Sequence, residues 1–213
     1  MTTKIHLLAG LLALTSLSQL NVVHAQGSVS IGAKAGYSQT SFSGNSSGTI
    51  SSSGMGLGGA FVNFHMLGFF AIQPELLVHQ KGAVHTENNV RDEIKINYFE
   101  VPVLFKLLIP IDAHVYPHVF VGPSFSYALN SSFTSTDVQS GQQVSANVGG
   151  ISKTDVGGVV GAGLDYETDH MFLTLDGRYG ASFNTIGSTV NLNLRNNNWT
   201  FMAGIGVRFG SSK

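Results

Sequence analysis

A two-residue alternation of apolar and polar side chains, sustained over long segments, constrains this chain more than any other feature. Eight segments carry it, and they cover residues 28–41, 54–66, 69–82, 93–109, 113–129, 153–167, 171–183 and 198–209. Alternation at this period predicts β-strands, because successive side chains of a strand point to opposite faces. Typical strands have about 5–6 residues. These segments are longer and reach the roughly 9–11 residues that a tilted strand needs to cross a bilayer.

Apart from the segment 54–66, the segments have one apolar face and one face that carries charges or glycine. In the segment 198–209, Ile205 lies on the first face, whereas Gly204 and Arg208 lie on the second. In a soluble β-protein the apolar face points to a core, but in a transmembrane barrel it contacts lipid and the charges line the interior. Glycine favours the barrel, because it weakens a water-exposed strand but leaves room for long side chains in a narrow lumen. The faces of the segment 54–66 stay unassigned.

This arrangement predicts an interior charge network, and the sequence assigns five cations and five anions to it. They are Lys34, Lys81, Lys106, Arg178 and Arg208 with Glu75, Glu100, Asp155, Asp165 and Asp176. Buried charges persist when they are paired, and a balanced set meets that requirement. Eight strands enclose only enough space for side chains, so we expect a filled interior.

The connections between the segments alternate between short turns and long polar loops. The short turns centre on residues 66–68, 110–112 and 168–170, and the long gaps cover 41–53, 82–92, 130–152 and 184–197. This asymmetry, with both chain ends on the short-turn side, is typical of an outer-membrane barrel. The expected fold class is therefore all-β, an eight-stranded antiparallel up-and-down transmembrane β-barrel.

Aromatic residues near the segment ends predict two interfacial girdles of the kind that flank such barrels. Those expected toward the short turns are Phe105, Tyr166, Phe172 and Phe209, and those expected toward the loops are Tyr37, Phe99, Tyr127, Phe183 and Trp199.

The N-terminus has the pattern of a secretory signal. Lys4 precedes an apolar stretch that closes on Val23-His24-Ala25. Small residues at −3 and −1 before Gln26 make a signal-peptidase cleavage site. Residues 1–25 are thus expected to be removed, which leaves residues 26–213 as one barrel domain. The net charge is −1, which gives no reason to expect a nucleic-acid partner. The chain has no cysteine, so a closed sheet or a large core must hold the exported protein together.

Seven strings carry a family resemblance when they are taken in order: IGAKAGYS, QPELLVHQKGA, YFEVPVLFKLL, VFVGPSFSYAL, DVGGVVGAGLDYE, LTLDGRYGASFNTI and FMAGIGVRF. They resemble the PorT-like outer-membrane β-barrel family, often labelled "porin family", and they span nearly the whole mature chain. The resemblance implies an OmpX/OmpA-like eight-stranded barrel in the outer membrane of a Gram-negative bacterium. It implies little about activity, because few members have an assigned one.

Several strings imitate functional sites without their structural context. Residues 54–59 fit GxGxxG and residues 44–48 fit GxSxG, but neither lies at the strand–turn–helix that such sites need. His114 and His118 share a strand face about 13 Å apart, at roughly 3.3 Å per residue, which is too far to bind one ion. We expect no catalytic, cofactor-binding or metal site, and we assign His79 to the interior polar network.

Three functions remain open for such a barrel. The first is a structural or binding role, in which an extracellular ligand or protein partner contacts loops 130–152 and 184–197. The second is a narrow porin-like channel for small solutes, which a lumen filled by ten charged groups opposes. The third is a lipid-modifying enzyme, which needs an activated nucleophile such as a His–Ser pair; the sequence shows no such spacing. The first is the function that we expect, in a monomer that contacts outer-membrane lipid. A role in secretion rests on the family name alone.

Overall fold

The computed structural model describes residues 27–43, 51–87, 89–111, 114–147, 153–183 and 195–210. The signal segment expected at 1–25 lies outside these residues. Within them no helix is both long enough and apolar enough to cross a membrane. The strands are β1 (Ser28–Ser43), β2 (Ser51–Leu67), β3 (Phe70–Glu87), β4 (Val90–Leu108), β5 (Val115–Asp137), β6 (Gln143–Asn147), β7 (Thr154–Glu167), β8 (Met171–Ser182) and β9 (Arg195–Phe209).

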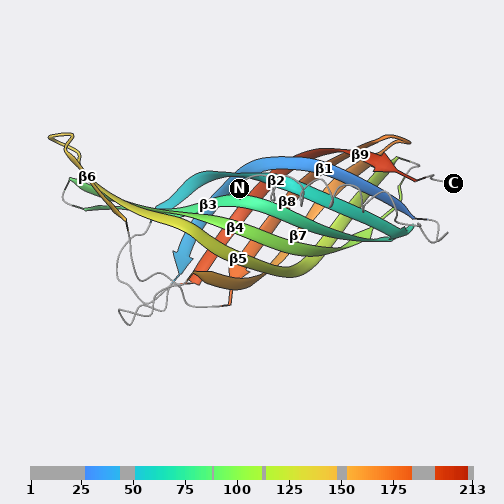
Figure 1. Ribbon diagram of the computed structural model, residues 1–213, viewed down its shortest axis with the longest axis horizontal. Helices are drawn as coiled ribbons and strands as arrows, with labels where there is room; N and C mark the ends of the chain where they lie inside the picture. The colour runs from blue at the N-terminus through green and yellow to red at the C-terminus, as the bar shows by residue number, and fades with distance from the viewer. Residues whose placement is uncertain are drawn as a thin grey trace, which may run out of the picture.

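Eight of these strands form a closed ring, which confirms the expected fold class. Each strand pairs antiparallel with its neighbours in the order β4-β3-β2-β1-β9-β8-β7-β5, and pairing of β4 with β5 closes the circle. Closure leaves no free edge in the ring, as a bilayer requires. Short turns join β2 to β3, β4 to β5 and β7 to β8. At the other end β3, β4 and β5 continue beyond the ring, where β6 lies beside them (Figure 1).

Two of the expected long loops are mostly strand, so those loop assignments are wrong. Residues 82–87 pair with residues 90–95 as the β3–β4 hairpin. Residues 132–136 pair with residues 143–147 as the β5–β6 hairpin. Polar or charged residues occupy successive positions in both hairpins, such as Asp92 and Glu93 on β4 and Thr134 and Ser135 on β5, so the apolar–polar alternation that identifies a strand is weak there. The loop residues 44–50, 148–152 and 184–194 lie outside the described residues.

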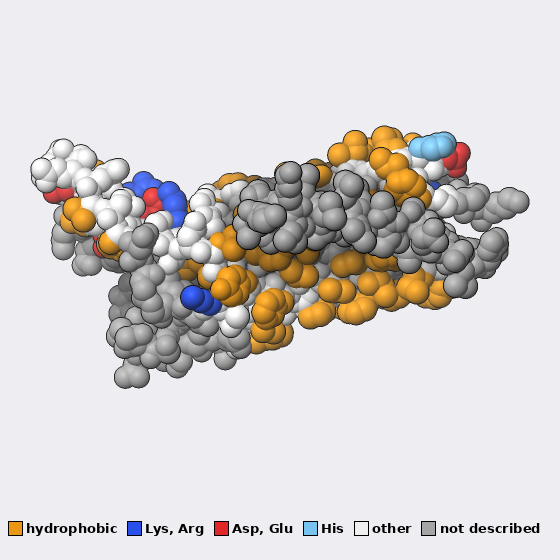
Figure 2. All heavy atoms as spheres, in the orientation of Figure 1, with side chains coloured by type: hydrophobic (Ala, Val, Ile, Leu, Met, Phe, Trp, Pro, Cys, Tyr) orange, Lys and Arg blue, Asp and Glu red, His pale blue; other side chains and the backbone are white. Residues whose placement is uncertain are grey.

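The wall of the ring is inside-out relative to a soluble protein. Leu175 and Ile205 face outward with 58% and 59% of their surface exposed, whereas Lys106 and Asp165 face the lumen and are fully buried. Apolar side chains cover much of the described barrel wall in Figure 2, and charged ones lie toward its ends. An outward apolar belt is what contact with lipid requires.

The lumen also contains apolar and aromatic side chains. On β2, whose faces the sequence left unassigned, Leu57 and Phe61 point inward and are buried. The aromatic residues expected in the girdles are exposed except for Phe172, for which the prediction is wrong. Phe172 is buried, and its ring centroid lies 5.5 Å from that of Phe61. It has the same strand parity as the inward Asp176, which explains its position.

Candidate functional site

All ten residues of the expected charge network are buried, and four of them form an ion-paired layer in the middle of the lumen. Lys34 Nζ lies 2.8 Å from Glu75 Oε1 and also contacts Asp176. Arg178 donates to Glu75 at 2.8 Å and to Asp176 at 3.1 Å. Strands β1, β3 and β8 contribute these groups, so their contacts tie together distant parts of the chain. Each charge in this layer meets two of opposite sign, which offsets the cost of desolvation.

A second ion pair lies against this layer on the side of the short turns. Lys106 Nζ donates to Asp165 at 2.6 Å and to Gln73 at 3.2 Å. His118 lies between two acids, with Nε2 3.2 Å from Asp176 and Nδ1 3.5 Å from Asp165. His118 is thus a buried member of the polar interior. This position was not predicted from the sequence, where His118 was paired only with His114 as a candidate metal site and excluded by the distance between them.

A third group, close to the short turns, contains an acid that the sequence interpretation missed. Glu167 is buried, and it contacts His65 at 3.2 Å and Arg208 at 3.3 Å. Among the residues that the structure describes, the interior therefore has six acids for five Lys and Arg residues, so the expected balance of five against five is wrong. Strand parity could have found Glu167, since it lies two residues after Asp165 and faces the same way.

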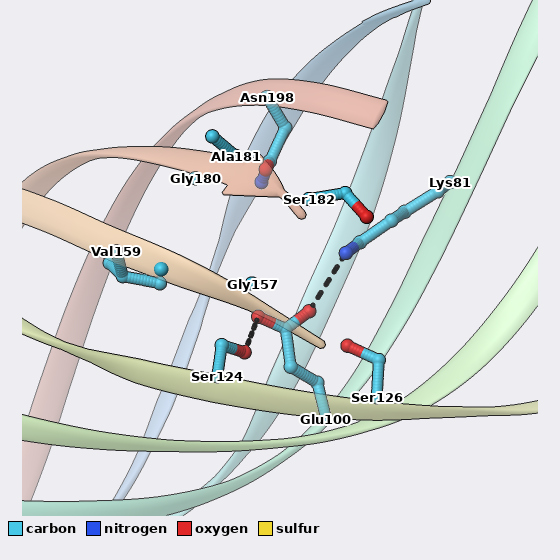
Figure 3. Close-up of a pocket in the computed structure, with 11 residues that line it drawn as sticks. Lys81, Glu100, Ser124, Ser126, Gly157, Val159, Gly180, Ala181, Ser182 and Asn198 are labelled. Atoms are coloured by element: carbon cyan, nitrogen blue, oxygen red, sulfur yellow. Dashed lines mark hydrogen bonds and ion pairs between the residues drawn. The ribbon is translucent and has the colours of Figure 1, made fainter. Parts of the chain in front are cut away.

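The fourth group lies at the loop-facing end of the lumen and centres on Glu100. Its carboxylate lies 3.1 Å from Lys81 Nζ and 3.0 Å from His79 Nδ1, and it accepts a hydrogen bond of 2.9 Å from Ser124. Figure 3 shows the contacts with Lys81 and Ser124. Here the acid lies between the histidine and the serine. Ser124 thus donates to the acid and not to the histidine, so these residues do not form the His–Ser pair in which the histidine is the base beside the nucleophile.

A small polar cavity adjoins Glu100, with a volume of about 20 Å³. That is space for about one water molecule. Its lining comes from β3, β4, β5, β7, β8 and β9 and comprises Lys81, Glu100, Ser124, Ser126, Gly157, Gly158, Val159, Gly180, Ala181, Ser182 and Asn198 (Figure 3). Asp155 lies two residues from Gly157 toward the loops and accepts a hydrogen bond from Ser182. Among the described residues, no group of three or more acids or histidines is arranged to hold a metal ion.

The extensions of β3, β4 and β5 form, with β6, a sheet that protrudes beyond the ring; we call it the protruding sheet (residues 82–87, 90–97, 130–137 and 143–147). Strand β6 pairs only with β5 among the described residues, so its other edge is open. Val138 and Val144, in the turn and on β6, have 58% and 71% of their surface exposed. An open edge presents unpaired N–H and C=O groups to any strand that approaches it.

Comparisons with known proteins agree with the barrel. A family model described as "Outer membrane protein beta-barrel domain" matches residues 19–187. A search of curated proteins gives no match. Among solved structures, Neisserial surface protein A (NspA) is 14% identical with a TM-score of 0.50, covering 85% of this chain and 97% of NspA. OprG of Pseudomonas aeruginosa is 12% identical with a TM-score of 0.49, covering 87% and 96%. Ail of Yersinia pestis is 16% identical with a TM-score of 0.44, covering 86% and 99%.

Proposed function

We propose that this protein, which belongs to the outer membrane protein β-barrel domain family and is an integral protein of the bacterial outer membrane, binds an extended polypeptide at the protruding sheet. The observation that carries this proposal is that, within the described part of the chain, β6 has a partner strand on one edge alone and lies outside the ring. A partner segment would add to that edge as a further strand. Main-chain hydrogen bonds would supply its affinity, and alternate side chains such as Val144 would supply selectivity.

The register identifies which groups of β6 are free to bind. Asp137 N–H donates to the Gln142 carbonyl at 3.0 Å, so residue 142 points its backbone groups toward β5. Orientation alternates along an antiparallel ladder, so the N–H groups of Gln143 and Ser145 point to the open edge. A proline at Ser145 therefore removes an edge donor without removing a backbone β5–β6 hydrogen bond. It also removes the 3.2 Å hydrogen bond between the Ser145 and Thr134 hydroxyls, which an alanine at this position removes as well.

The test compares Ser145→Pro with the matched control Ser145→Ala, which keeps the N–H. Wild-type protein in lipid nanodiscs is screened against immobilised synthetic peptides rich in Val, Ile and Thr. We expect wild type and Ser145→Ala to bind the same peptides. Ser145→Pro should bind them several-fold more weakly, because each lost hydrogen bond contributes about 0.5–1.5 kcal/mol. Equal binding by the proline variant would exclude this edge as the binding surface.

We also propose that the barrel conducts no solutes, although a narrow channel was the main alternative. Support comes from the buried ion pairs that cross the lumen, such as Lys34 with Glu75 and Lys106 with Asp165. Purified protein in planar bilayers should give no stepwise conductance. Reproducible open-channel steps would overturn this part of the proposal and leave the edge of β6 untouched.

The absence of enzymatic activity is likewise a proposal, and it is supported by the order of Ser124, Glu100 and His79, in which the acid separates the other two. Lipid A extracted from cells with and without the protein should give identical mass spectra. A mass shift that depends on the protein would favour the lipid-modifying alternative.

Three finer assignments complete the proposal. The motifs given above support membership of the PorT-like branch. Small residues before Gln26 support removal of residues 1–25, which N-terminal sequencing of the mature protein would check. The closed ring supports a monomer, to be measured by light scattering of the protein in detergent.

Loop 184–197, whose residues 184–194 lie outside the described part of the chain, remains a second candidate contact surface.

A further inference from the structure

Asp155 differs from the other five interior acids in its partners. Glu75, Glu100, Asp165, Glu167 and Asp176 each lie within 4.0 Å of a Lys or Arg nitrogen. Asp155 is 6% exposed, and its contact among the described residues is the Ser182 hydroxyl. Lys153, two residues before it, is exposed and forms no ion pair with it. A buried carboxylate without a cation is costly, so its position calls for a counter-charge from outside the chain.

Asp155 does not itself line the polar cavity, but two residues next to it do. Ser182, which donates to Asp155, lines the cavity, and Ser126, which also lines it, is the register partner of Asp155 across β5 and β7. Ser126 is 3% exposed and makes no hydrogen bond with the described side chains. Figure 3 shows its hydroxyl pointing toward Glu100 and the middle of the cavity. Buried hydroxyl groups usually have a hydrogen-bond partner, so one that faces a polar cavity is available to contact a bound ion or water.

The size, charge and donor atoms of this region select the kind of partner. The cavity of about 20 Å³ accepts one species the size of water. Lys81 contributes one positive charge, and Glu100 and Asp155 contribute two negative charges, so the two carboxylates exceed the one ammonium by one negative charge. Carboxylate and hydroxyl oxygens suit hard cations. A divalent ion is disfavoured, because its two positive charges and the one of Lys81 would exceed the two negative charges of Glu100 and Asp155.

We propose that the loop-facing end of the lumen binds a single small monovalent cation, held by the Asp155 carboxylate together with the Ser126 and Ser182 hydroxyls. An alkali ion and the ammonium group of a primary amine share the required chemistry. The site lies within the ring and is separate from the open edge of β6.

The experiment uses the full mature protein in detergent micelles and follows thermal unfolding by circular dichroism. Chloride salts of Na⁺, K⁺, methylammonium and tetramethylammonium are compared at equal ionic strength, since the last cation is too large for a water-sized cavity. We expect a saturable rise in Tm with at least one small cation relative to tetramethylammonium, because a ligand that binds the folded state stabilises it. The cation that gives the rise distinguishes an alkali-ion site from an amine site.

The variants separate this site from general salt effects. Asp155→Asn should still fold. Its Tm in tetramethylammonium chloride should be no lower than that of wild type, because the Asp155 carboxylate has no Lys or Arg partner to lose among the described residues. It should also lose the response to small cations, whereas the exposed-acid control Asp137→Asn keeps it. Ser126→Ala should need a several-fold higher cation concentration for the half-maximal effect. A wild-type Tm that is equal in all four salts, or an unchanged response in Asp155→Asn, would overturn the proposal.

Discussion

Single residues in the lumen depend on particular partners, and Glu100 shows how much one substitution should cost. The cation beside Glu100 is Lys81, whereas Lys106 pairs with Asp165. Glu100→Ala leaves the Lys81 ammonium buried without that acid, and it also removes the acceptor of Ser124. We expect a loss of about 3–5 kcal/mol in the free energy of unfolding, the usual cost of breaking a buried pair.

The measurement is the temperature of the heat-induced gel-mobility transition, supported by denaturant unfolding. Glu93→Ala is the matched control, because Glu93 pairs with Lys95 on the protruding sheet at 3.1 Å with both side chains partly exposed. Surface pairs contribute about 0–1 kcal/mol, so this control should differ little from wild type. If the two variants behave alike, burial of Glu100 in a dry lumen is not what stabilises the barrel.

Glycine at the lumen wall should be as sensitive to substitution as the charges. A Cβ on Gly163 would clash with the Leu175 carbonyl oxygen and lie 2.7 Å from His118 Nε2 and 2.8 Å from Asp176 Oδ1. Gly163→Ala should therefore destabilise the barrel by about 1–3 kcal/mol, as overpacking does. Gly56→Ala is the control, since no atom lies within 4 Å of its added Cβ. Denaturant titration of both variants would contradict this account if Gly56→Ala lost as much stability as Gly163→Ala.

Whole strands were more predictable than their ends or their partners. Alternation located the eight strands of the ring, because one face of each contacts lipid and the other contacts charge. It could not locate β6 or the upper parts of β3 and β4, where polar residues occupy both faces. The interior ion pairs join residues as far apart as 142 positions, as for Lys34 and Asp176. Such pairs follow from strand register, which alternation leaves free by steps of two residues.

The hairpin between β5 and β6 depends on a carboxylate at its turn. The backbone N–H groups of Ser140 and Gln139 each donate to Asp137 Oδ1 at 2.9 Å, and these hydrogen bonds lower the pKa of Asp137 below its ordinary value of 3.8. A carboxyl group whose pKa is lowered on folding stabilises the fold above its unfolded pKa. That contribution is lost as the pH falls below 3.8 and through the lowered pKa.

We therefore expect the amide protons of Gln139 and Ser140 to be protected from exchange at pH 5 and to lose protection in the acid range below that ordinary pKa. Hydrogen exchange followed by NMR in micelles measures this directly. Asp137→Asn keeps an acceptor oxygen that does not titrate, so its protection should be independent of pH there. The same acid-induced loss in Asp137→Asn would show that another group controls the turn.

At the scale of the molecule, the ring and the protruding sheet meet different solvents although both expose apolar side chains. Val160, near the middle of β7, has 53% of its surface exposed, and Val144 on β6 has 71% exposed. By exposed fraction alone, Val144 would have more contact with solvent or lipid than Val160 has. The two differ in what surrounds them, because Val160 lies on the ring wall, in the belt that contacts acyl chains, and Val144 lies on the sheet beyond it (Figure 1).

Arginine at the two positions should separate these environments. Val160→Arg places a charge in hydrocarbon, which costs about 2–4 kcal/mol near the bilayer midplane. Val144→Arg places the same charge in water, where a surface substitution changes stability by less than about 0.5 kcal/mol. Both variants are folded into lipid vesicles, and their free energies of unfolding are measured by guanidinium titration. Equal losses at the two sites would mean that the wall around Val160 does not face lipid, because the substitutions are identical and only the surrounding medium differs.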